Sequence, residues 1–359
     1  MNTTTRTKRN LWWLIALSTL LATLNGQAEK FDSDKKKEIN QSFPISTDGK
    51  LVVDNRYGNV TVTHWSKNEV SIRVVIESKA RSESEAQRGL DRVNVQIQKS
   101  GNTVYAKTSL IDQSGNSGNH RININYYISI PFKLAVNISQ KYGSINLPEK
   151  NEGKCELEVK YGNIIAGSFT LPLKIDAGYS NINLNEVQDL RMDLSYCGNV
   201  DVNNGGNLNI DSKYSNLKMG NVGKLKLEQK YSNLTMQKAD KVSMDIKYSE
   251  IKIGHVKEEI DIDELSYSTL TINELSSNFK RIKVEAKYGT LNLSIPSNAS
   301  FNVNAQNMKH GNLDVKGFNI TNSNIENKVN YYYQINGGNS NNVIDFEGNN
   351  YSSLKIRTL

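Results

Sequence analysis

The chain has 359 residues, enough for one or two domains, and its aromatic residues are dominated by 17 Tyr against 8 Phe and 3 Trp. With only 5 Pro and many Asn, Ser, Thr, Ile and Val residues, this composition is typical of a β-rich protein with many turns. The formal charge of +7 is a mild excess, and the charges are interleaved along the chain, which argues against a nucleic-acid partner.

Residues 1–28 are predicted to form a secretory signal peptide. Basic residues in the first nine positions precede an apolar run at 11–24, and Gly26-Gln27-Ala28 offers small residues for cleavage. The alternative is an uncleaved anchor, but this run is shorter than the roughly 20 residues that cross a bilayer. We therefore expect an exported protein, periplasmic, outer-membrane-associated or extracellular, with no transmembrane span after cleavage.

The region 29–135 is predicted to form a first coil and an N-terminal cap. Tyr57-Gly58-Asn59-Val60 follows a short strand at 51–53. A helix is expected to begin after Ser82, because Glu85 three residues later completes a capping box. Further strands are expected at 69–77, 92–99, 103–110 and 121–130. Such a cap would cover the open end of a stack against edge pairing.

Residues 136–315 repeat one four-residue signature every 17–22 residues: Tyr, then Gly or Ser, often Asn, then an aliphatic residue. A period near 20 is typical of stacked coils of one supersecondary unit. The copy at Tyr196 carries an extra residue, Cys197, and His310 replaces the tyrosine in the last copy. The signature tyrosines are Tyr142, Tyr161, Tyr179, Tyr196, Tyr214, Tyr231, Tyr248, Tyr267 and Tyr288.

Alternation within each coil predicts a β-strand before the tyrosine. In the coil of Tyr231, Leu225 and Leu227 are expected to face inward, and Glu228 and Lys230 to face solvent in rows of opposite charge. A second short strand follows each tyrosine, and a third inward-facing side follows that strand, as at Val222. Three sides predict a triangular cross-section, without room for an internal ligand. The predicted fold is all-β, a parallel β-solenoid of about ten coils with a β-rich cap that contains one short helix.

The tyrosines share the parity of the inward residues, so we interpret them as a stacked corner ladder with rings over the core and hydroxyls reaching water. The alternative is an exposed aromatic stripe that binds sugar rings. The two cysteines, Cys155 and Cys197, lie two coils apart, which places them roughly 10 Å apart along the axis at the usual strand spacing and predicts free thiols.

The coil between Tyr248 and Tyr267 breaks the pattern, because inward residues change parity there, which predicts a bulge. This coil is also rich in acids. Asp261, Asp263 and Glu264 are candidate ligands for Ca²⁺, although such a site needs six to eight converging oxygens. We expect an acidic bulge without metal, and no cofactor.

Residues 316–359 are Asn-rich and lose the period. Strands are expected around Tyr331-Tyr332-Tyr333, at 343–346 and at 354–356, where they would close the C-terminal end. The three tyrosines could alternatively bind a partner.

No catalytic motif is evident. The four histidines are far apart, no glycine loop precedes a helix, and no serine stands in a nucleophile-elbow context. Acids and lysines recur in every coil, which makes them a property of the repeat.

The segment Val52-Val53-Asp54-Asn55-Arg56-Tyr57-Gly58-Asn59-Val60-Thr61-Val62, the Ile130-Pro131 step and the tyrosine coils resemble the bacterial putative-adhesin family. The resemblance covers roughly residues 40–315 and implies an exported β-solenoid of the kind common in the Bacteroidetes group. That family has no agreed catalytic or binding residues, so none is carried over.

The leading hypothesis is a non-enzymatic exported binding module that presents strand faces to a surface glycan, an envelope component or a protein. A structural or signalling-accessory role in the envelope is the alternative, and a glycan-cleaving β-helix enzyme is the third. The oligomeric state does not follow from the sequence.

Overall fold

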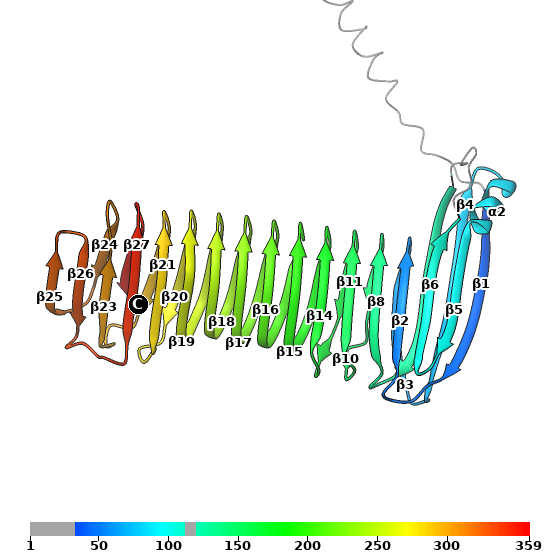
Figure 1. The fold of residues 1–359 in the computed structure, drawn as a ribbon, viewed down its shortest axis with the longest axis horizontal. Coiled ribbons are helices and arrows are strands. Elements are labelled where there is room, and N and C mark those ends of the chain that lie inside the picture. The colour runs from blue at the N-terminus through cyan, green and yellow to red at the C-terminus, as the bar shows by residue number, and fades with distance from the viewer. Residues whose placement is uncertain (1–32, 112–119) are drawn as a thin grey trace, which may run out of the picture.

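The computed structural model describes residues 33–111 and 120–359, so the predicted signal peptide lies outside the described residues. The described chain is almost entirely β, with one short helix, and its strands form one large, mostly parallel sheet. The strands stack side by side into a long rod (Figure 1). In the described residues, no helix is both long enough and apolar enough to cross a membrane.

The N-terminal end of the rod is built from antiparallel strands. β4 lies between β1 and β7, and β5 and β6 form a hairpin. The helix α2 (Glu83–Asp91) begins after Ser82, whose hydroxyl accepts a hydrogen bond from the Glu85 amide, as the capping box predicts. The sequence analysis missed β1, whose lysine run hides the alternation of a strand. The strands are β1 (Ser33–Pro44), β4 (Glu69–Ala80), β5 (Val93–Ser100), β6 (Thr103–Leu110) and β7 (His120–Pro131).

A buried polar chain joins this cap to the first coil, β2 (Lys50–Arg56) and β3 (Val60–Trp65). Thr108 contacts the Tyr126 hydroxyl at 2.8 Å and donates to the Asn55 side chain at 2.9 Å. Asn55 in turn donates to the Gln140 amide oxygen at 3.0 Å, and burial raises the pKa of Tyr126 to about 12. Because each of these buried groups has a partner, the cap docks in one register.

The central part of the rod repeats one unit. β2 pairs in parallel with β8, so the strand that leads into Tyr57 stacks directly on the strand that leads into Tyr142. From β15 to β19 most of each coil is one continuous strand that pairs in parallel with its neighbours, and after β19 each coil is again divided into two shorter strands. The strands are β8 (Ala135–Lys141), β9 (Ile145–Asn146), β10 (Lys150–Asn151), β11 (Cys155–Lys160), β12 (Asn163–Ala166), β13 (Ser168–Phe169), β14 (Leu173–Gly178), β15 (Asn181–Ser195), β16 (Val200–Lys213), β17 (Asn216–Lys230), β18 (Asn233–Lys247), β19 (Glu250–Ser266), β20 (Thr269–Leu275), β21 (Arg281–Lys287) and β22 (Thr290–Ile295).

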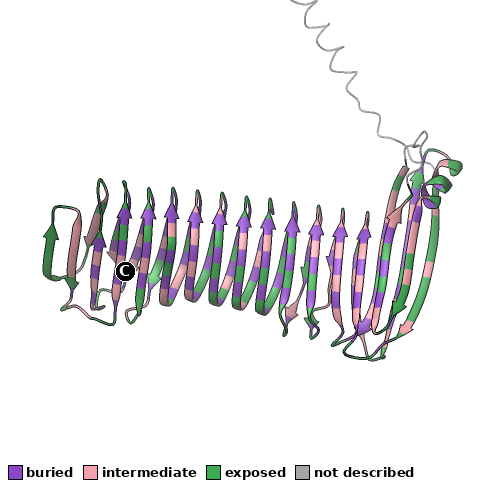
Figure 2. Cartoon of the chain, viewed as in Figure 1, coloured by how far each residue is buried: buried purple, intermediate pink, exposed green. Residues whose placement is uncertain are grey.

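The register aligns equivalent positions, so the core is a set of parallel apolar rows. Leu208, Leu225 and Val242 are consecutive partners, and each is at most 3% exposed. The alternation of buried and exposed residues is visible along the strands in Figure 2. Val222, on the third inward side, is also buried, so the predicted inward rows are confirmed. Cys155 and Cys197 are buried in this core as free thiols, as predicted.

The C-terminal strands do not follow chain order. β27 pairs in parallel with both β21 and β23, and β28 pairs with both β22 and β24, so the last segment is inserted one coil before the end of the rod. The expectation that coils follow one another as far as 315 is therefore wrong. The antiparallel strands β26 and β25 close the end instead (Figure 1). The strands are β23 (Phe301–Gln306), β24 (Asn312–Lys316), β25 (Ile320–Glu326), β26 (Asn330–Ile335), β27 (Val343–Asn349) and β28 (Ser353–Thr358).

Candidate functional site

The signature tyrosines stack into one ladder along a corner of the rod. From Tyr57 to Tyr288, neighbouring ring centroids are 4.8–5.2 Å apart and the ring planes differ by 2–13°. Tyr351 stacks on Tyr288 at 6.0 Å, and His310 stacks on Tyr351 at 5.2 Å. The sequence analysis missed Tyr351, although Tyr351-Ser352-Ser353-Leu354 is a further copy of the signature.

The tyrosine rings do not lie over the core. The prediction that they would, which was based on the parity that the tyrosines share with the inward residues, is wrong. The ladder tyrosines have φ between 48° and 61° and are 36–61% exposed. A left-handed residue interrupts the alternation of a strand, so the side chain turns outward at a position where the pattern predicts inward. The left-handed corner of each coil therefore falls on the tyrosine itself.

The residue after each tyrosine is small because the coils approach closely there. A Cβ on Gly162 would lie 1.8 Å from the Gly143 carbonyl oxygen. Where serine stands instead, its hydroxyl satisfies the backbone of two coils: Ser232 donates to the Lys230 carbonyl at 2.9 Å and accepts from the Ser215 amide at 2.9 Å. The Gly or Ser of the signature therefore has a structural role.

The stacking limits what the ladder can bind. Within the ladder both faces of a ring are covered by neighbouring rings, whereas binding of a sugar ring to an aromatic side chain uses the ring face. The interior of the ladder therefore presents ring edges and hydroxyls. An asparagine row runs beside it, in which Asn181 donates to Asn163 at 3.0 Å and Asn233 donates to Asn216 at 3.2 Å.

The acidic coil is bulged, as predicted, and its carboxylates are paired with lysines. Register shifts occur opposite 239–241 and 244–245 of the preceding coil. Glu258 contacts Lys280 at 3.0 Å, and Glu264 contacts Lys247 at 2.5 Å. Burial alone would raise the pKa of Glu264, but hydrogen bonds from Lys247 and Ser266 hold that pKa below its usual value.

The three candidate calcium ligands are not brought into one site. Asp261 is the register partner of Ser243 and Lys283, whereas Glu264 is the partner of Asp245. Asp263 lies in the bulge between them. Among the described residues, no group of three His, Cys, Asp or Glu side chains could hold a metal ion.

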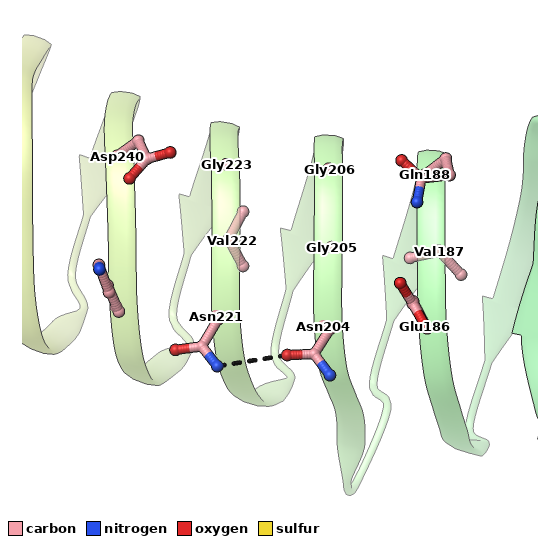
Figure 3. A pocket seen from close by; sticks show the side chains of 11 residues that line it. Glu186, Val187, Gln188, Asn204, Gly205, Gly206, Asn221, Val222, Gly223 and Asp240 are labelled. Atoms are coloured by element: carbon pink, nitrogen blue, oxygen red, sulfur yellow. Dashed lines mark hydrogen bonds between the residues drawn. The ribbon is translucent and has the colours of Figure 1, made fainter.

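A hollow of about 610 Å³ on the described surface lies across β15 to β18 and was not predicted. Asn204 and Asn221 form its centre, and the Asn221 amide donates to the Asn204 oxygen at 3.3 Å (Figure 3). Charged residues of both signs line it, with Glu186 at one end and Lys238 and Asp240 at the other. We call this region the amide hollow. Its lining residues are Glu186, Val187, Gln188, Asn204, Gly205, Gly206, Asn221, Val222, Gly223, Lys238 and Asp240.

The hollow exists because glycines stand where neighbouring coils carry side chains. Gly206 and Gly223 are flanked along the stack by Gln188 and Asp240 (Figure 3). A Cβ on Gly206 would lie 2.4 Å from the Gln188 carbonyl oxygen, so the close packing of the coils also requires glycine there. The signal in the sequence was the pair Gly205-Gly206 followed by Gly223, which interrupts the repeat.

A second hollow, of about 450 Å³, adjoins the first and shares Asn204 and Asn221 with it. It adds Asn183, Asn203 and Gln237 to the lining. Together the two present amide donors and acceptors over several coils. The shared amides supply hydrogen-bond donors and acceptors, and the ionisable groups of the lining are Glu186, Lys238 and Asp240 in the first hollow and Asp201 and Lys218 in the second.

No family model matches the chain, and no curated protein is significantly similar to it. Similar solved structures include a putative cell adhesion protein from Clostridium sporogenes, with 13% identity and a TM-score of 0.21, which covers 90% of this chain and 100% of that chain. A putative adhesin from Bacteroides fragilis has 11% identity and a TM-score of 0.28, with 90% and 98% covered. A putative lipid binding protein from Parabacteroides distasonis has 12% identity and a TM-score of 0.30, with 74% and 94% covered.

The second carries the same adhesin name as the family that the sequence resembles, and the first is named a cell adhesion protein. At these identities and TM-scores the comparison assigns neither a ligand nor a site to this chain.

Proposed function

We propose that this chain is a non-enzymatic, exported, adhesin-like binding module of about ten solenoid coils, and that the amide hollow is its binding site for an uncharged or mixed-charge glycan. The observation that carries the proposal is that the hollow is a local exception in a repeating surface. Elsewhere the outward rows carry acids and lysines that pair with each other, as Lys213 does with Asp211 at 3.5 Å.

The lining indicates the class of ligand. Amide side chains both donate and accept hydrogen bonds, which suits a ligand that carries many hydroxyl groups. The charges of Glu186 and Asp240 oppose that of Lys238, so the hollow favours neither a polyanion nor a polycation. Covered ring faces remove the usual stacking contribution, so we expect weak binding per site that gains strength when several copies engage one polymer.

An envelope structural role is the alternative, because much of the rod is uniform and its surface charges are mutually neutralised. A glycan-cleaving enzyme is the third reading. Inverting and retaining glycosidases need two carboxylates about 5–9.5 Å apart that flank the scissile bond. Burial raises the pKa of Asp245, and Glu228 and Glu264 are its register partners in the two adjacent coils. Because these acids occupy the same position in successive coils, we attribute them to the repeat and not to a catalytic pair.

The test is binding of the purified mature protein, residues 29–359, to a glycan panel and to matrix proteins. The double variant Asn204→Ala/Asn221→Ala should weaken glycan binding at least about tenfold, as expected when hydrogen bonds worth roughly 1.4 kcal/mol are lost. The matched control is Asn216→Ala/Asn233→Ala, which removes an equivalent amide pair on the tyrosine flank and should leave binding unchanged.

Equal loss from both double variants would place the site elsewhere on the rod. Absence of binding to every polymer would favour the structural role. A reducing-end assay on the same glycans, with and without Ca²⁺, should show no turnover; cleavage that disappears in Asp261→Asn/Asp263→Asn would overturn the non-enzymatic proposal.

A further inference from the structure

The C-terminal end of the rod presents an open strand edge. β25 pairs with β26 on one side, and no described strand pairs with its other side. All seven residues of β25 are exposed, and it is the outermost strand in Figures 1 and 2. An exposed edge offers a row of unpaired backbone N–H and C=O groups to another chain.

The opposite end of the rod is protected against such pairing. Its outer strand β1 carries Lys35, Lys36 and Lys37 in succession, so both faces of that edge are charged. The helix α2 also contacts it through the ion pair between Lys35 and Glu83. β25 has only one charged residue, Glu326. The C-terminal edge therefore lacks the run of lysines that discourages strand pairing at the N-terminal edge.

The core is also less completely covered at the C-terminal end. Phe318 is only partly buried, where it packs edge-on against Phe301 at 5.4 Å. Ile320 and Ile325 of β25 are 41% and 51% exposed, and Ile325 is the register partner of Tyr331. Apolar side chains therefore lie beside the open edge.

We propose that β25 pairs antiparallel with β25 of a second copy of this chain and so joins two rods end to end as a symmetric dimer. β25 contains an extra residue near Thr321 relative to β26, which leaves 322–326 as the regular part of the edge. A two-fold axis at Asn324 places Asn324 opposite its own copy, Ser323 opposite Ile325, and Asn322 opposite Glu326. Amide faces amide and amide faces carboxylate, so no like charges are opposed.

A second copy fits this edge better than the lysine-rich β1 end does, because only the β25–β25 pairing is isologous and closes after two subunits. Pairing of β25 with β1 would repeat without closure and produce filaments. The symmetric dimer also brings the two incompletely covered core ends together.

The test is the mass of the mature protein by light scattering and sedimentation over a range of concentrations. The unmodified chain should reach twice the monomer mass. Asn324→Lys places two lysines opposite each other and should raise the dimer dissociation constant at least about tenfold, with partial recovery at high salt. Asn322→Lys is the matched control, because it faces Glu326 of the second copy and should leave the dissociation constant unchanged or lower it.

Both positions are exposed, so both variants should keep the parent's melting temperature at concentrations where all three proteins are monomeric, which separates a lost interface from a folding defect. A monomer at every soluble concentration would overturn the proposal. Open-ended oligomers that both lysine variants weaken equally would overturn the symmetric pairing and indicate contact with the β1 end. Because β15 to β18, which line the amide hollow, are remote from β25 in Figure 1, the outcome is independent of glycan binding.

Discussion

The tyrosine ladder makes an unusual prediction about substitutions at Tyr231. Its ring stacks on Tyr214 at 5.0 Å and on Tyr248 at 4.9 Å, both within 3° of parallel. Two aromatic pairs contribute about 1–3 kcal/mol beyond area burial. Adding the partial burial of the ring, Tyr231→Ala should lower the free energy of unfolding by about 2–4 kcal/mol.

Glycine should be tolerated better than alanine at this position. The φ of Tyr231 is 52°, a conformation that costs a residue with a Cβ about 1–2 kcal/mol and costs glycine almost nothing. Tyr231→Gly loses the same ring but relieves this strain, so it should be less destabilising than Tyr231→Ala by about 0.5–1 kcal/mol. In an ordinary strand the order is the reverse.

The assay is denaturant unfolding of five variants alongside the parent protein: the alanine and glycine variants of Tyr231 and the three that follow. Tyr231→Phe keeps the ring stack and should stay within about 0.5 kcal/mol. The fully buried Leu227→Ala should cost about 2–5 kcal/mol, and the outward Lys230→Ala under about 1 kcal/mol. If Tyr231→Gly proved as destabilising as Tyr231→Ala, or more so, the left-handed corner would not be the reason for the outward ring.

Three further outcomes are expected. Cys155 and Cys197 should not react with a thiol reagent at pH 8 in the folded protein, because burial raises the pKa of Cys155 to about 12 and also raises that of Cys197. Two equivalents of the reagent should react after unfolding, and an intramolecular disulfide would contradict the strand register. Gly162→Ala should lower the free energy of unfolding by about 3 kcal/mol in the same assay, because its Cβ would meet the Gly143 carbonyl. A neutral effect would mean that neighbouring coils do not approach closely at this corner. Asp245→Asn should raise the melting temperature at pH 7, because burial raises the folded-state pKa of Asp245. Ionisation of Asp245 therefore destabilises the fold above that pKa and has no effect below the unfolded value near 3.9. Calorimetry at pH 7 and pH 3 should show the gain only at pH 7.

Local pattern was sufficient for much of this architecture. Residues that are paired between neighbouring strands, such as Leu208 and Leu225, are separated in the sequence by the same number of residues as neighbouring signatures. The two spacings agree because one coil must return the chain to the same row. The capping box at Ser82 and the bulge after Tyr248 were also predictable, since both depend on residues close in sequence. Alternation predicted the inward rows for the same reason.

Three features depended on tertiary structure. The tyrosine ring faces outward because its backbone is left-handed, which a parity argument cannot reveal. Tyr351 joins the ladder between Tyr288 and His310 because β27 and β28 are inserted into the stack, and a pairing between strands distant in the chain is a non-local choice. The amide hollow arises where Gly206 and Gly223, from separate coils, align along the rod. The sequence by itself determined the repeat and its inward rows, because these are local periodicities; only the packing of coil on coil decided which side chains meet and where the surface is hollow.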